Sequence, residues 1–350
     1  TAGMARAMLE HSLNNEALPA KVAYVTSCYR YEKPQAGRLR EFHQFGVECF
    51  GAASPAADAE VISIGAQGLS ALGVQGVRLE INSIGCPECR AKYTQALKEY
   101  FGARKDELCD TCRGRLERNP MRILDCKSPV CSAIAAGAPH MLDYLCKDCA
   151  DHFAALQSHL TAMGIAYEIN PTIVRGLDYY TRTVFEFVTD QIGAQGTVCG
   201  GGRYDDLAGY YTNKSLPGVG ISIGLTRLFY ILQEQNMISD AVLTAPADVL
   251  ILPMTDDLSA AVSLASMLRA GGLRVQLYSE KKKFKAKIGY ADKLGIPFVI
   301  FLGEDEIAQN VCALKNMDTG VQEAVTQAAA LETIRAEIAR RTAGAILRES

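Results

Sequence analysis

The segment Val174–Glu186 constrains this chain more than any other part of its sequence. It places two arginines, an aspartate and two tyrosines just before the apolar residues of a predicted strand. Burying guanidinium, carboxylate and phenol groups costs free energy unless a partner satisfies their hydrogen bonds. By itself the segment could be a solvated turn, as many polar loops are. Two further blocks rich in glycine and polar residues follow at Gly200–Asp206 and Gly218–Arg227, so a binding site for a polar molecule is the better prediction.

Two blocks upstream, Cys28–Glu32 and Gly37–Phe45, complete a set that resembles the bacterial histidyl-tRNA synthetase family of class II aminoacyl-tRNA synthetases. In that family, Arg-x-Glu followed by a second arginine block is class motif 2, and the glycine-rich segment ending in arginine is class motif 3. The blocks around Arg175 and Arg203 are peculiar to the histidine enzymes. All occur here in the family's order, over essentially the whole chain, and this combination is far more specific than a lone glycine motif.

The composition agrees with a multidomain enzyme in a reducing compartment. At 350 residues the chain is too long for one typical core, so two or three domains are expected. Twelve cysteines fit reduced thiols better than a disulfide scaffold, because disulfide-dense chains are mostly short and secreted. No apolar run approaches the ~18 residues of a membrane helix and no signal peptide is evident, so we expect a cytoplasmic protein without membrane contact. The net charge of −3 means that any basic surface for RNA must be local.

The first residues, Thr1–Ala7, resemble the second half of the family's Pro-Glu-Gly-Thr loop, whose threonine and glutamate hold the substrate amino acid. The loop glutamate is absent from this sequence, and so is class motif 1, which builds the family's dimer interface. The resemblance therefore predicts a chain without its N-terminal segment, and a homodimer when that segment is present. The predicted activity refers to the protein with this segment.

The hydrophobic pattern and the resemblance predict a discontinuous catalytic core at residues 1–84 and 167–242. We expect an α+β domain with the antiparallel sheet of the class II synthetase fold, backed by helices. Its expected strands lie at residues 22–28, 42–50, 77–84, 184–188 and 218–223, and its expected helix at residues 57–72.

Two other domains are predicted. Residues 85–166 are expected to form an inserted, mainly helical, cysteine-rich domain. After a linker at residues 243–247, residues 247–350 resemble the family's α/β anticodon-binding domain. Short apolar strands alternate there with helical runs, a pattern that implies a parallel sheet. These strands are expected at residues 249–252, 273–277 and 298–302.

Eight cysteines in the expected insert have the spacing of metal ligands. A Cys-x-x-Cys pair lets both thiolates reach one tetrahedral zinc ion at about 2.3 Å per bond. Eight sulfurs could hold two structural zinc ions in a grouping that the spacing leaves open. The alternative is a set of reduced, unliganded thiols, whereas redox activity lacks the thioredoxin-like frame it would need. The candidate ligands are Cys86, Cys89, Cys109, Cys112, Cys126, Cys131, Cys146 and Cys149.

Activation of a carboxylic acid by ATP brings two anions together, so fixed cations around the α-phosphate are the main means of lowering the barrier. By resemblance, Arg30 and Arg175 are the catalytic residues, with Arg30 bridging the substrate carboxylate and the α-phosphate. Arg175 reaches the α-phosphate from the opposite side. Arg38 and Arg227 grip the outer phosphates together with Mg²⁺. The resemblance thus implies ATP and Mg²⁺ as cofactors, and an ATP-binding set of Arg30, Glu32 at the adenine amine, Arg38, Phe42 stacked on adenine, and Arg227.

A pocket for a neutral imidazole needs partners for one donor and one acceptor. By resemblance, Glu48 and Tyr180 read the ring, while Gln44 and Tyr179 line the same pocket. Thr1 and Gln44 would lie near the α-amino group. Ordinary strand packing is the alternative for each of them. The implied histidine-binding set is Thr1, Arg30, Gln44, Glu48, Arg175, Tyr179 and Tyr180.

The resemblance implies L-histidine and tRNA(His) as partners. The lysine-rich run at residues 281–287 could meet RNA phosphates, although most such runs are solvated helix faces. Arginines between residues 113 and 122 could lie along the acceptor arm. Two other functions are weighed: a non-catalytic regulatory paralogue that pairs with ATP phosphoribosyltransferase, and an RNA-sensing module of a regulatory kinase. The first should lack the histidine-specific blocks and the second should have degraded class motifs, and this sequence keeps both.

Overall fold

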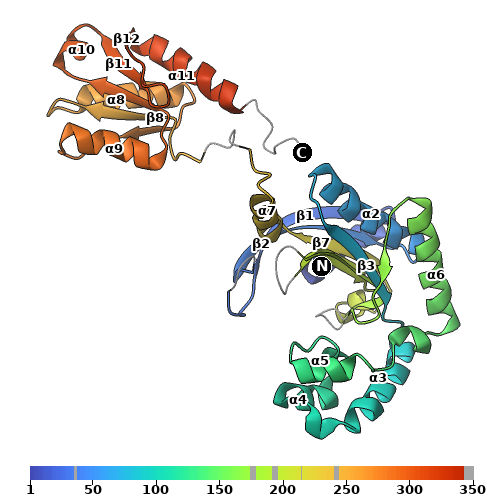
Figure 1. Ribbon diagram of the computed structural model, residues 1–350. Helices are drawn as coiled ribbons and strands as arrows, with labels where there is room; N and C mark the ends of the chain where they lie inside the picture. Colours follow the sequence, from blue (N-terminus) through green and yellow to red (C-terminus); the bar gives the residue numbers. More distant parts are fainter. Residues whose placement is uncertain (35–37, 174–178, 191–195, 214, 240–243, 343–350) are drawn as a thin grey trace. The chain divides into compact units, whose positions relative to one another are not determined.

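The computed structural model describes residues 1–34, 38–173, 179–190, 196–213, 215–239 and 244–342. The chain divides into two compact units, Thr1–Asn236 and Met237–Ser350, and each has its own sheet (Figure 1). Within the described ranges, the structure contains no helix that is both long and apolar enough to cross a membrane.

A seven-stranded sheet forms the centre of the first unit, in the order β1-β2-β7-β6-β5-β3-β4. Neighbouring strands are antiparallel, except that β3 and β4 are parallel. The predicted α+β core with an antiparallel sheet is therefore confirmed. The strands are β1 (Ala20–Tyr29), β2 (Glu41–Phe50), β3 (Val77–Ser83), β4 (Glu168–Ile169), β5 (Thr181–Thr189), β6 (Thr197–Arg203) and β7 (Gly218–Gly224).

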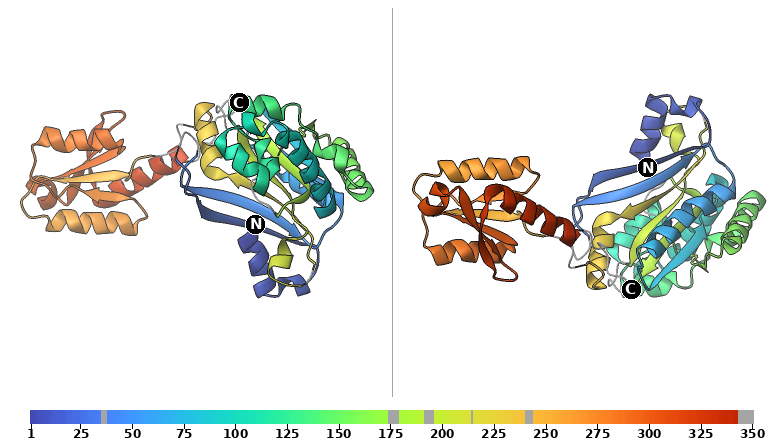
Figure 2. Two further views of the ribbon diagram at one scale, coloured as in Figure 1. Left: turned by 90° about the horizontal axis from the view of Figure 1, so that it is seen from below. Right: turned by 90° about the horizontal axis from the view of Figure 1, so that it is seen from above.

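Helices α2 (Pro55–Ala71) and α6 (Lys147–Ala162) cover the sheet. Helix α2 packs against β5, β6 and β7, and α6 packs on α2 (Figure 2). The start of α2 follows from its sequence, because the Ser54 hydroxyl accepts a hydrogen bond from the Ala56 amide at 3.2 Å and Pro55 occupies the first turn. The unit also contains α1 (Ala2–Glu10) and α7 (Leu225–Glu234).

Strand β6 is absent from the sequence-based expectation. The run Gly200–Gly202 shows no alternation of side chains and has a low strand propensity. In the structure, β6 lies between β5 and β7, and a Cβ atom on Gly201 would overlap the backbone carbonyl of Gly220. Glycine is needed there because two backbones approach closely.

The segment between β3 and α6 is helical and rich in cysteine, as predicted. It contains α3 (Pro87–Gly102), α4 (Asp110–Arg118) and α5 (Pro129–Ala135), joined by short 3₁₀ turns. A small apolar core includes Tyr93, Leu97 and Phe101 of α3 together with buried cysteines. Its exact boundaries as a separate domain stay a prediction.

The second unit has a five-stranded sheet in the order β12-β11-β10-β8-β9. The three expected strands, β8 (Val249–Pro253), β9 (Val275–Leu277) and β10 (Phe298–Leu302), are parallel as predicted. The expectation of a parallel sheet is wrong at one edge, where β11 (Val311–Asn316) and β12 (Gln322–Thr326) add antiparallel strands. An antiparallel pair needs a short turn instead of a crossover helix, so alternation of strands and helices does not reveal it.

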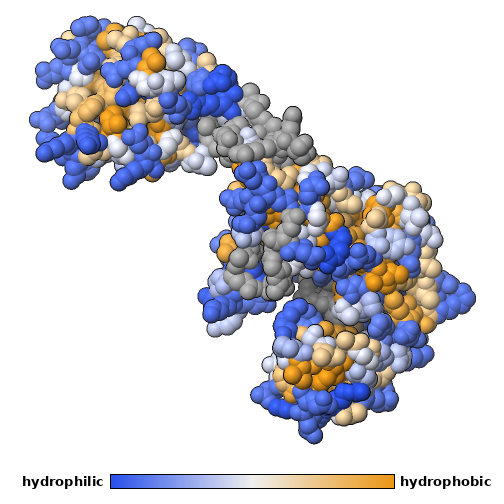
Figure 3. Space-filling model, viewed as in Figure 1, coloured by the Kyte–Doolittle hydropathy of each residue, from blue (hydrophilic) through white to orange (hydrophobic). Residues whose placement is uncertain are grey.

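The central strands β8 and β10 of the second sheet are buried on both faces. Val249 and Ile251 pack with α8 (Ser259–Ala270) and α11 (Gln327–Thr342), whereas Leu250 and Leu252 pack with α9 (Phe284–Leu294) on the opposite face. Burial on both faces explains why β8 is apolar throughout. Many hydrophilic residues cover the visible surface of the unit (Figure 3). The short helix α10 (Glu304–Ala308) precedes β11.

Candidate active site

Strand β2 carries candidate residues for two ligands on one face. Side chains alternate along a strand, so Phe42, Gln44, Gly46 and Glu48 point to the same side. At about 3.4 Å per residue, Phe42 and Glu48 lie about 20 Å apart along the strand. A polar cavity lies at the Phe42 end, and a buried carboxylate lies at the Glu48 end.

A cavity of about 560 Å³ opens beside the Phe42 end of β2. Arg30, Arg38, Phe42, Gln44 and Arg227 all line it, although they come from distant parts of the sequence. The Arg30 guanidinium lies 3.8 Å from the centroid of the Phe42 ring. Because Arg30 covers one face of the ring in this arrangement, a base stacked on Phe42 would use the other face or displace the guanidinium.

The arginines make their part of the cavity suited to an anion. Burial lowers the pKa of Arg30 and of Arg227, and in both cases the nearby charge of Arg38 lowers the pKa further. The charge of Arg30 also lowers the pKa of Arg227. Guanidiniums held this close repel one another, so an anion bound among them would be stabilised by several cations at once.

Acidic and polar groups that the sequence analysis missed also line the cavity. Glu80 and Glu186 face each other across the β3–β5 pair and are among its lining residues. Ser222 of β7 lines it too, and its hydroxyl is buried without a hydrogen-bond partner within the part of the chain that the structure describes. Asp125 and Lys127 contribute from the cysteine-rich segment. The sequence gives little sign of the two glutamates, because a single glutamate in a strand does not show which residue lies opposite it.

Glu32 contacts one of the other predicted ATP residues but does not itself line the cavity. Its carboxylate forms an ion pair with Arg38, and it is not among the described residues that line the cavity. Half of its side chain is exposed. In this structure Glu32 therefore holds Arg38, and contact with an adenine amine stays a prediction.

Glu48 is fully buried between two phenols at the other end of β2. Its carboxylate accepts hydrogen bonds from the hydroxyls of Tyr24, at 3.0 Å, and Tyr204. The backbone nitrogen of Thr1 lies 3.4 Å from the same carboxylate. Burial and the charge of Glu48 both raise the pKa values of Tyr24 and Tyr204, so both phenols stay protonated donors at neutral pH. A Cβ atom on Gly220 would overlap the Glu48 carboxylate, so this position of β7 needs glycine.

The two predicted histidine-binding tyrosines lie beside this carboxylate group. The ring centroids of Tyr179 and Tyr180 are 4.9 Å apart, and the Tyr179 ring meets the Tyr204 ring edge-on at 6.1 Å. Tyr180 is buried, with 6% of its surface exposed. The structure thus brings Thr1, Glu48, Tyr179 and Tyr180 together, while Gln44 lines the cavity. Arg175 lies outside the described residues, so its predicted roles stay predictions.

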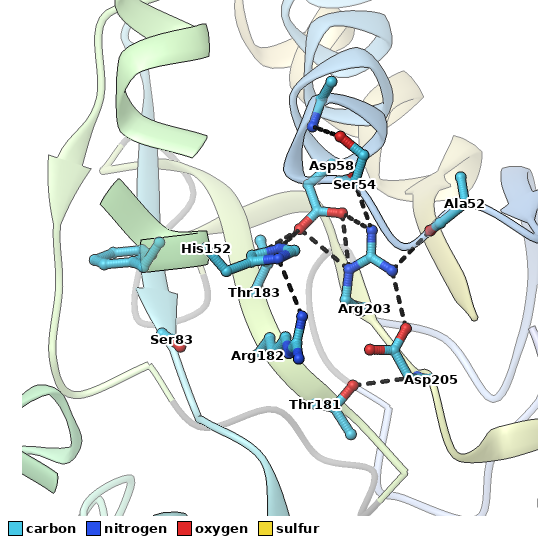
Figure 4. Close-up of polar contacts among 12 residues, drawn as sticks. Ala52, Ser54, Asp58, Ser83, His152, Thr181, Arg182, Thr183, Arg203 and Asp205 are labelled. Carbon is cyan, nitrogen blue, oxygen red and sulfur yellow. Dashed lines mark hydrogen bonds and ion pairs between the residues drawn. The ribbon is translucent and has the colours of Figure 1, made fainter. Parts of the chain in front are cut away.

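The glycine-rich strand β6 is held by a buried polar network that the sequence did not reveal (Figure 4). The Arg203 side chain is fully buried and forms an ion pair with Asp58 of α2. Its Nε donates to Asp58 Oδ1 at 3.0 Å. His152 donates from Nε2 to Asp58 at 2.7 Å, because its Nδ1 accepts from the Arg182 guanidinium at 3.3 Å. Arg203 therefore positions the strand next to Tyr204 and is not exposed to a ligand.

Ionisation of Asp58 fits this arrangement. Burial opposes its charge, but the hydrogen bond from His152 and the charge of Arg203 outweigh burial and lower the pKa of Asp58 below its ordinary value of 3.8. The carboxylate is therefore charged at neutral pH and compensates the buried guanidinium.

The eight predicted metal-ligand cysteines gather into two groups. Within each group the four sulfur atoms lie within 4.8 Å of one another, which is close enough for a shared metal ion. The root cluster consists of Cys86, Cys89, Cys146 and Cys149, and the distal cluster consists of Cys109, Cys112, Cys126 and Cys131.

Two protein-family profiles match this chain. The sequence profile described as "Histidyl-tRNA synthetase" matches residues 1–101 and 130–228. The profile described as "Anticodon binding domain" matches residues 248–337, which cover most of the second unit.

Individual proteins are also similar to this chain. A "Histidine--tRNA ligase" of Caldanaerobacter subterraneus subsp. tengcongensis is 49% identical over 91% of this chain and 76% of its own length. One from Acetivibrio thermocellus is 46% identical over 93% of this chain and 78% of its own length. The crystal structure of the apo histidyl-tRNA synthetase of S. aureus superposes with a TM-score of 0.70 and 32% identity, over 96% of this chain and 82% of that one.

Proposed function

This chain belongs to the histidyl-tRNA synthetase family, and we propose that it activates histidine with ATP and attaches it to tRNA(His). One observation carries the proposal beyond the family. A single face of β2 joins a cavity lined by three arginines to a fully buried carboxylate held by two phenols. The arginine-lined cavity suits the phosphates of ATP, and the buried carboxylate suits a small ligand with an N–H donor.

The proposed reaction starts at the arginine cavity. The histidine carboxylate attacks the α-phosphorus of ATP in line, pyrophosphate leaves, and histidyl-adenylate forms. Negative charge accumulates on the phosphoryl oxygens in the transition state, so the guanidiniums of Arg30, Arg38 and Arg227 stabilise it. Arg30 is suited to bridge the two anions because its planar fork can donate to both.

ATP normally binds with Mg²⁺, and the cavity offers suitable oxygen ligands. The carboxylates of Glu80 and Glu186 belong to residues directly opposite each other on β3 and β5. Glu80 also pairs with Arg78 at 3.0 Å and Glu186 accepts a hydrogen bond from the Thr197 hydroxyl at 2.8 Å, but both residues line the cavity and could each offer a carboxylate oxygen to a divalent cation. When bound, Mg²⁺ would neutralise charge on the outer phosphates.

Glu48 is the proposed reader of the imidazole ring. A carboxylate is an acceptor, so it matches the ring N–H, while a tyrosine hydroxyl can donate to the other ring nitrogen. Amino acids without these groups would bring no donor to the carboxylate and no acceptor to the hydroxyl, so they would bind more weakly than histidine. Thr1, Gln44, Tyr179 and Tyr180 would complete the pocket, with Arg175 contributing from outside the described residues.

The second unit is proposed to recognise the anticodon of tRNA(His), as its family profile indicates. It would supply binding and orientation instead of a catalytic group, since the anticodon lies far from the reacting end of tRNA. Cytoplasmic location follows from the proposed role in translation. A homodimer formed with the class motif 1 segment is a further part of the proposal.

A regulatory, non-catalytic role is not favoured. The relatives at 49% and 46% identity are both described as ligases. The arginines of class motifs 2 and 3, Arg30 and Arg227, are present and line one cavity. A regulatory paralogue or a kinase module would not need this arrangement.

The test is histidine-dependent exchange of pyrophosphate into ATP, followed by charging of tRNA(His). Both are measured on this chain and on the chain extended by the class motif 1 segment that the resemblance predicts. Exchange with histidine and with no other amino acid is the expected result. Equal exchange with several amino acids would refute the specificity, and no exchange by the extended chain would favour the regulatory role.

Deletion of residues 248–350 separates the two half-reactions. Because the residues that line the cavity lie before residue 248, adenylate formation should persist while charging of tRNA falls strongly. Equal charging by the full and shortened proteins would show that the second unit does not recognise tRNA.

A further inference from the structure

The two cysteine clusters have the geometry of mononuclear metal sites. The sulfurs of Cys86 and Cys89 are 3.5 Å apart, and those of Cys109 and Cys126 are 4.0 Å apart. Four thiolates around one zinc ion at about 2.3 Å per bond would lie about 3.8 Å from one another. A disulfide would require about 2.05 Å between two sulfurs. A four-iron cluster would separate the sulfurs further, because each would bind a different iron.

Both clusters are built at helix starts. Cys86 precedes α3 and Cys146 precedes α6, and in each case the second cysteine of the pair lies within the first turn. Cys109 has the same position before α4. The cysteines in the first turns, Cys89, Cys112 and Cys149, are almost fully buried. Their sulfur atoms therefore lie inside the segment and not at its surface.

Backbone amides point at the sulfurs. The Cys146 amide donates to Cys89 Sγ at 3.0 Å in the root cluster. In the distal cluster, the Cys109 amide donates to Cys131 Sγ at 3.3 Å and the Ser128 amide donates to Cys126 Sγ at 3.5 Å. Such hydrogen bonds stabilise negative charge on sulfur and orient metal-bound thiolates. Reduced thiols that merely fill an apolar core would not need them.

The part of the segment beyond α3 has little regular secondary structure. Beyond α3, residues 103–146 contain two helices of 9 and 7 residues and short 3₁₀ turns. Chains of this size usually need a metal or disulfides to stay folded, because they bury too little apolar surface. The cysteines of both clusters are themselves part of the apolar core of the segment.

We infer that each cluster holds one Zn²⁺ ion, so that the chain binds two structural zinc ions, and that the root site supports the histidine pocket. The four-sulfur donor set favours zinc, whose role here would be structural because all four coordination positions are filled by protein. At the root site, the ion would join the two ends of the cysteine-rich segment, because Cys86 lies at its start and Cys146 at its end. At the distal site, all four ligands lie in the interior of the segment.

The root site is connected to Tyr180 through short contacts. Gly85, which precedes Cys86, accepts a hydrogen bond from the Arg182 amide at 2.8 Å. Arg90 of α3 donates to the Tyr180 carbonyl oxygen at 3.0 Å. An ion at the root site would hold α3, and with it Arg90, against the backbone of Tyr180. This part of the inference rests on the proposed function, whereas zinc binding does not.

The distal site is connected to the arginine cavity instead. Asp125 and Lys127, on either side of Cys126, line that cavity. Loss of the two ions should therefore have different kinetic effects, which allows the connection at the root site to be tested.

The first experiment measures metal in the purified protein by elemental analysis and X-ray absorption. We expect close to two zinc ions per chain, each with four sulfur neighbours at about 2.3 Å. Iron in place of zinc would overturn the choice of metal. No bound metal, with the cluster thiols either reactive in the native protein or joined in disulfides, would overturn the sites. This measurement needs no variant, so it does not depend on whether a variant folds.

The grouping is tested with pairs of substitutions. Cys86→Ser and Cys146→Ser, alone or together, should each leave one zinc ion per chain, because both ligands serve the same ion. Cys86→Ser combined with Cys126→Ser should leave none. The matched control is Cys312→Ala, a buried thiol in the second unit, which should retain two ions. If the double variant Cys86→Ser/Cys146→Ser lost as much zinc as Cys86→Ser/Cys126→Ser, the grouping would be overturned.

The connection to the histidine pocket is tested by pyrophosphate exchange. Cys146→Ser should raise KM for histidine roughly 3- to 10-fold, the value of one hydrogen bond, with a smaller effect on KM for ATP. Cys126→Ser should not raise KM for histidine in this way. Similar changes in both variants would overturn the connection while the metal content still decides the zinc sites. A lack of exchange in the unmodified, extended chain would instead contradict the proposed function.

Discussion

Replacement of Asp58 by Asn tests the buried network that holds strand β6. The Asp58 carboxylate accepts hydrogen bonds from Arg203, from His152 at 2.7 Å and from the Thr183 hydroxyl at 2.5 Å. All of these groups are buried. Asparagine keeps nearly the same shape but removes the charge that compensates Arg203, and its amide group presents a donor where the carboxylate accepted.

The expected loss of stability depends on the hydrogen bonds that Arg203 retains in the Asp58→Asn variant. Removing one partner of a buried ion pair costs about 3–5 kcal/mol. Arg203 still donates to Asp205 at 2.9 Å and to the carbonyl oxygens of Ala52, at 2.8 Å, and Ser54, at 3.2 Å. We therefore expect the lower end of that range, about 3 kcal/mol. In a unit of this size, each kcal/mol lowers Tm by about 2–4 °C, so Tm should fall by about 6–12 °C.

The assay is differential scanning calorimetry of the full chain, combined with hydrogen exchange of peptides from β6 and α2. The second unit, whose sheet has its own core, provides an internal reference that should not change. The control variant is Asp205→Asn, because Asp205 contacts the same guanidinium but its side chain is 24% exposed. It should cost about 1 kcal/mol or less. The reasoning is refuted if the two variants have the same Tm, or if Asp58→Asn unfolds within 1 °C of the unmodified protein, roughly the smallest shift that half a kcal/mol would produce.

Three further predictions concern the substrate sites and pH. Glu48→Gln should raise KM for histidine roughly 10- to 100-fold, because a buried hydrogen bond to a charged acceptor is worth about 1.5–3 kcal/mol. The same variant should change KM for ATP little. An equal rise in both KM values would contradict a role of Glu48 in reading histidine. Arg227→Ala should raise KM for ATP roughly 10-fold or more in pyrophosphate exchange, since one cation of the cavity is lost, whereas an unchanged value would place the phosphates elsewhere. The pKa of Asp58 is lowered on folding, so its stabilisation is complete above its ordinary value of 3.8 and is lost as pH falls through the lower folded pKa. Chemical unfolding below pH 4 should therefore show a steeper loss of stability in the unmodified protein than in Asp58→Asn, and parallel curves would argue against this contribution.

Local pattern determined much of what could be read from the sequence. The hydrophobic pattern indicated a strand at residues 42–50, and the resemblance singled out Phe42, Gln44 and Glu48, which do share one face. The apolar runs of β8 and β10 indicated strands of a parallel sheet, and the two strands do pair in parallel. Residue type and spacing also identified the eight cysteines as candidate ligands. Features of this kind depend on neighbours a few residues apart, so a sequence displays them directly.

Tertiary structure decided which distant residues meet. It divided the cysteines into two groups, placed Glu80 opposite Glu186, and buried Arg203 against Asp58, which lies far away in the sequence. It also made a central strand of Gly200–Gly202, where close backbone approach replaces side-chain pattern. Such pairings are set by the packing of whole elements against one another, and no short window of sequence contains both partners.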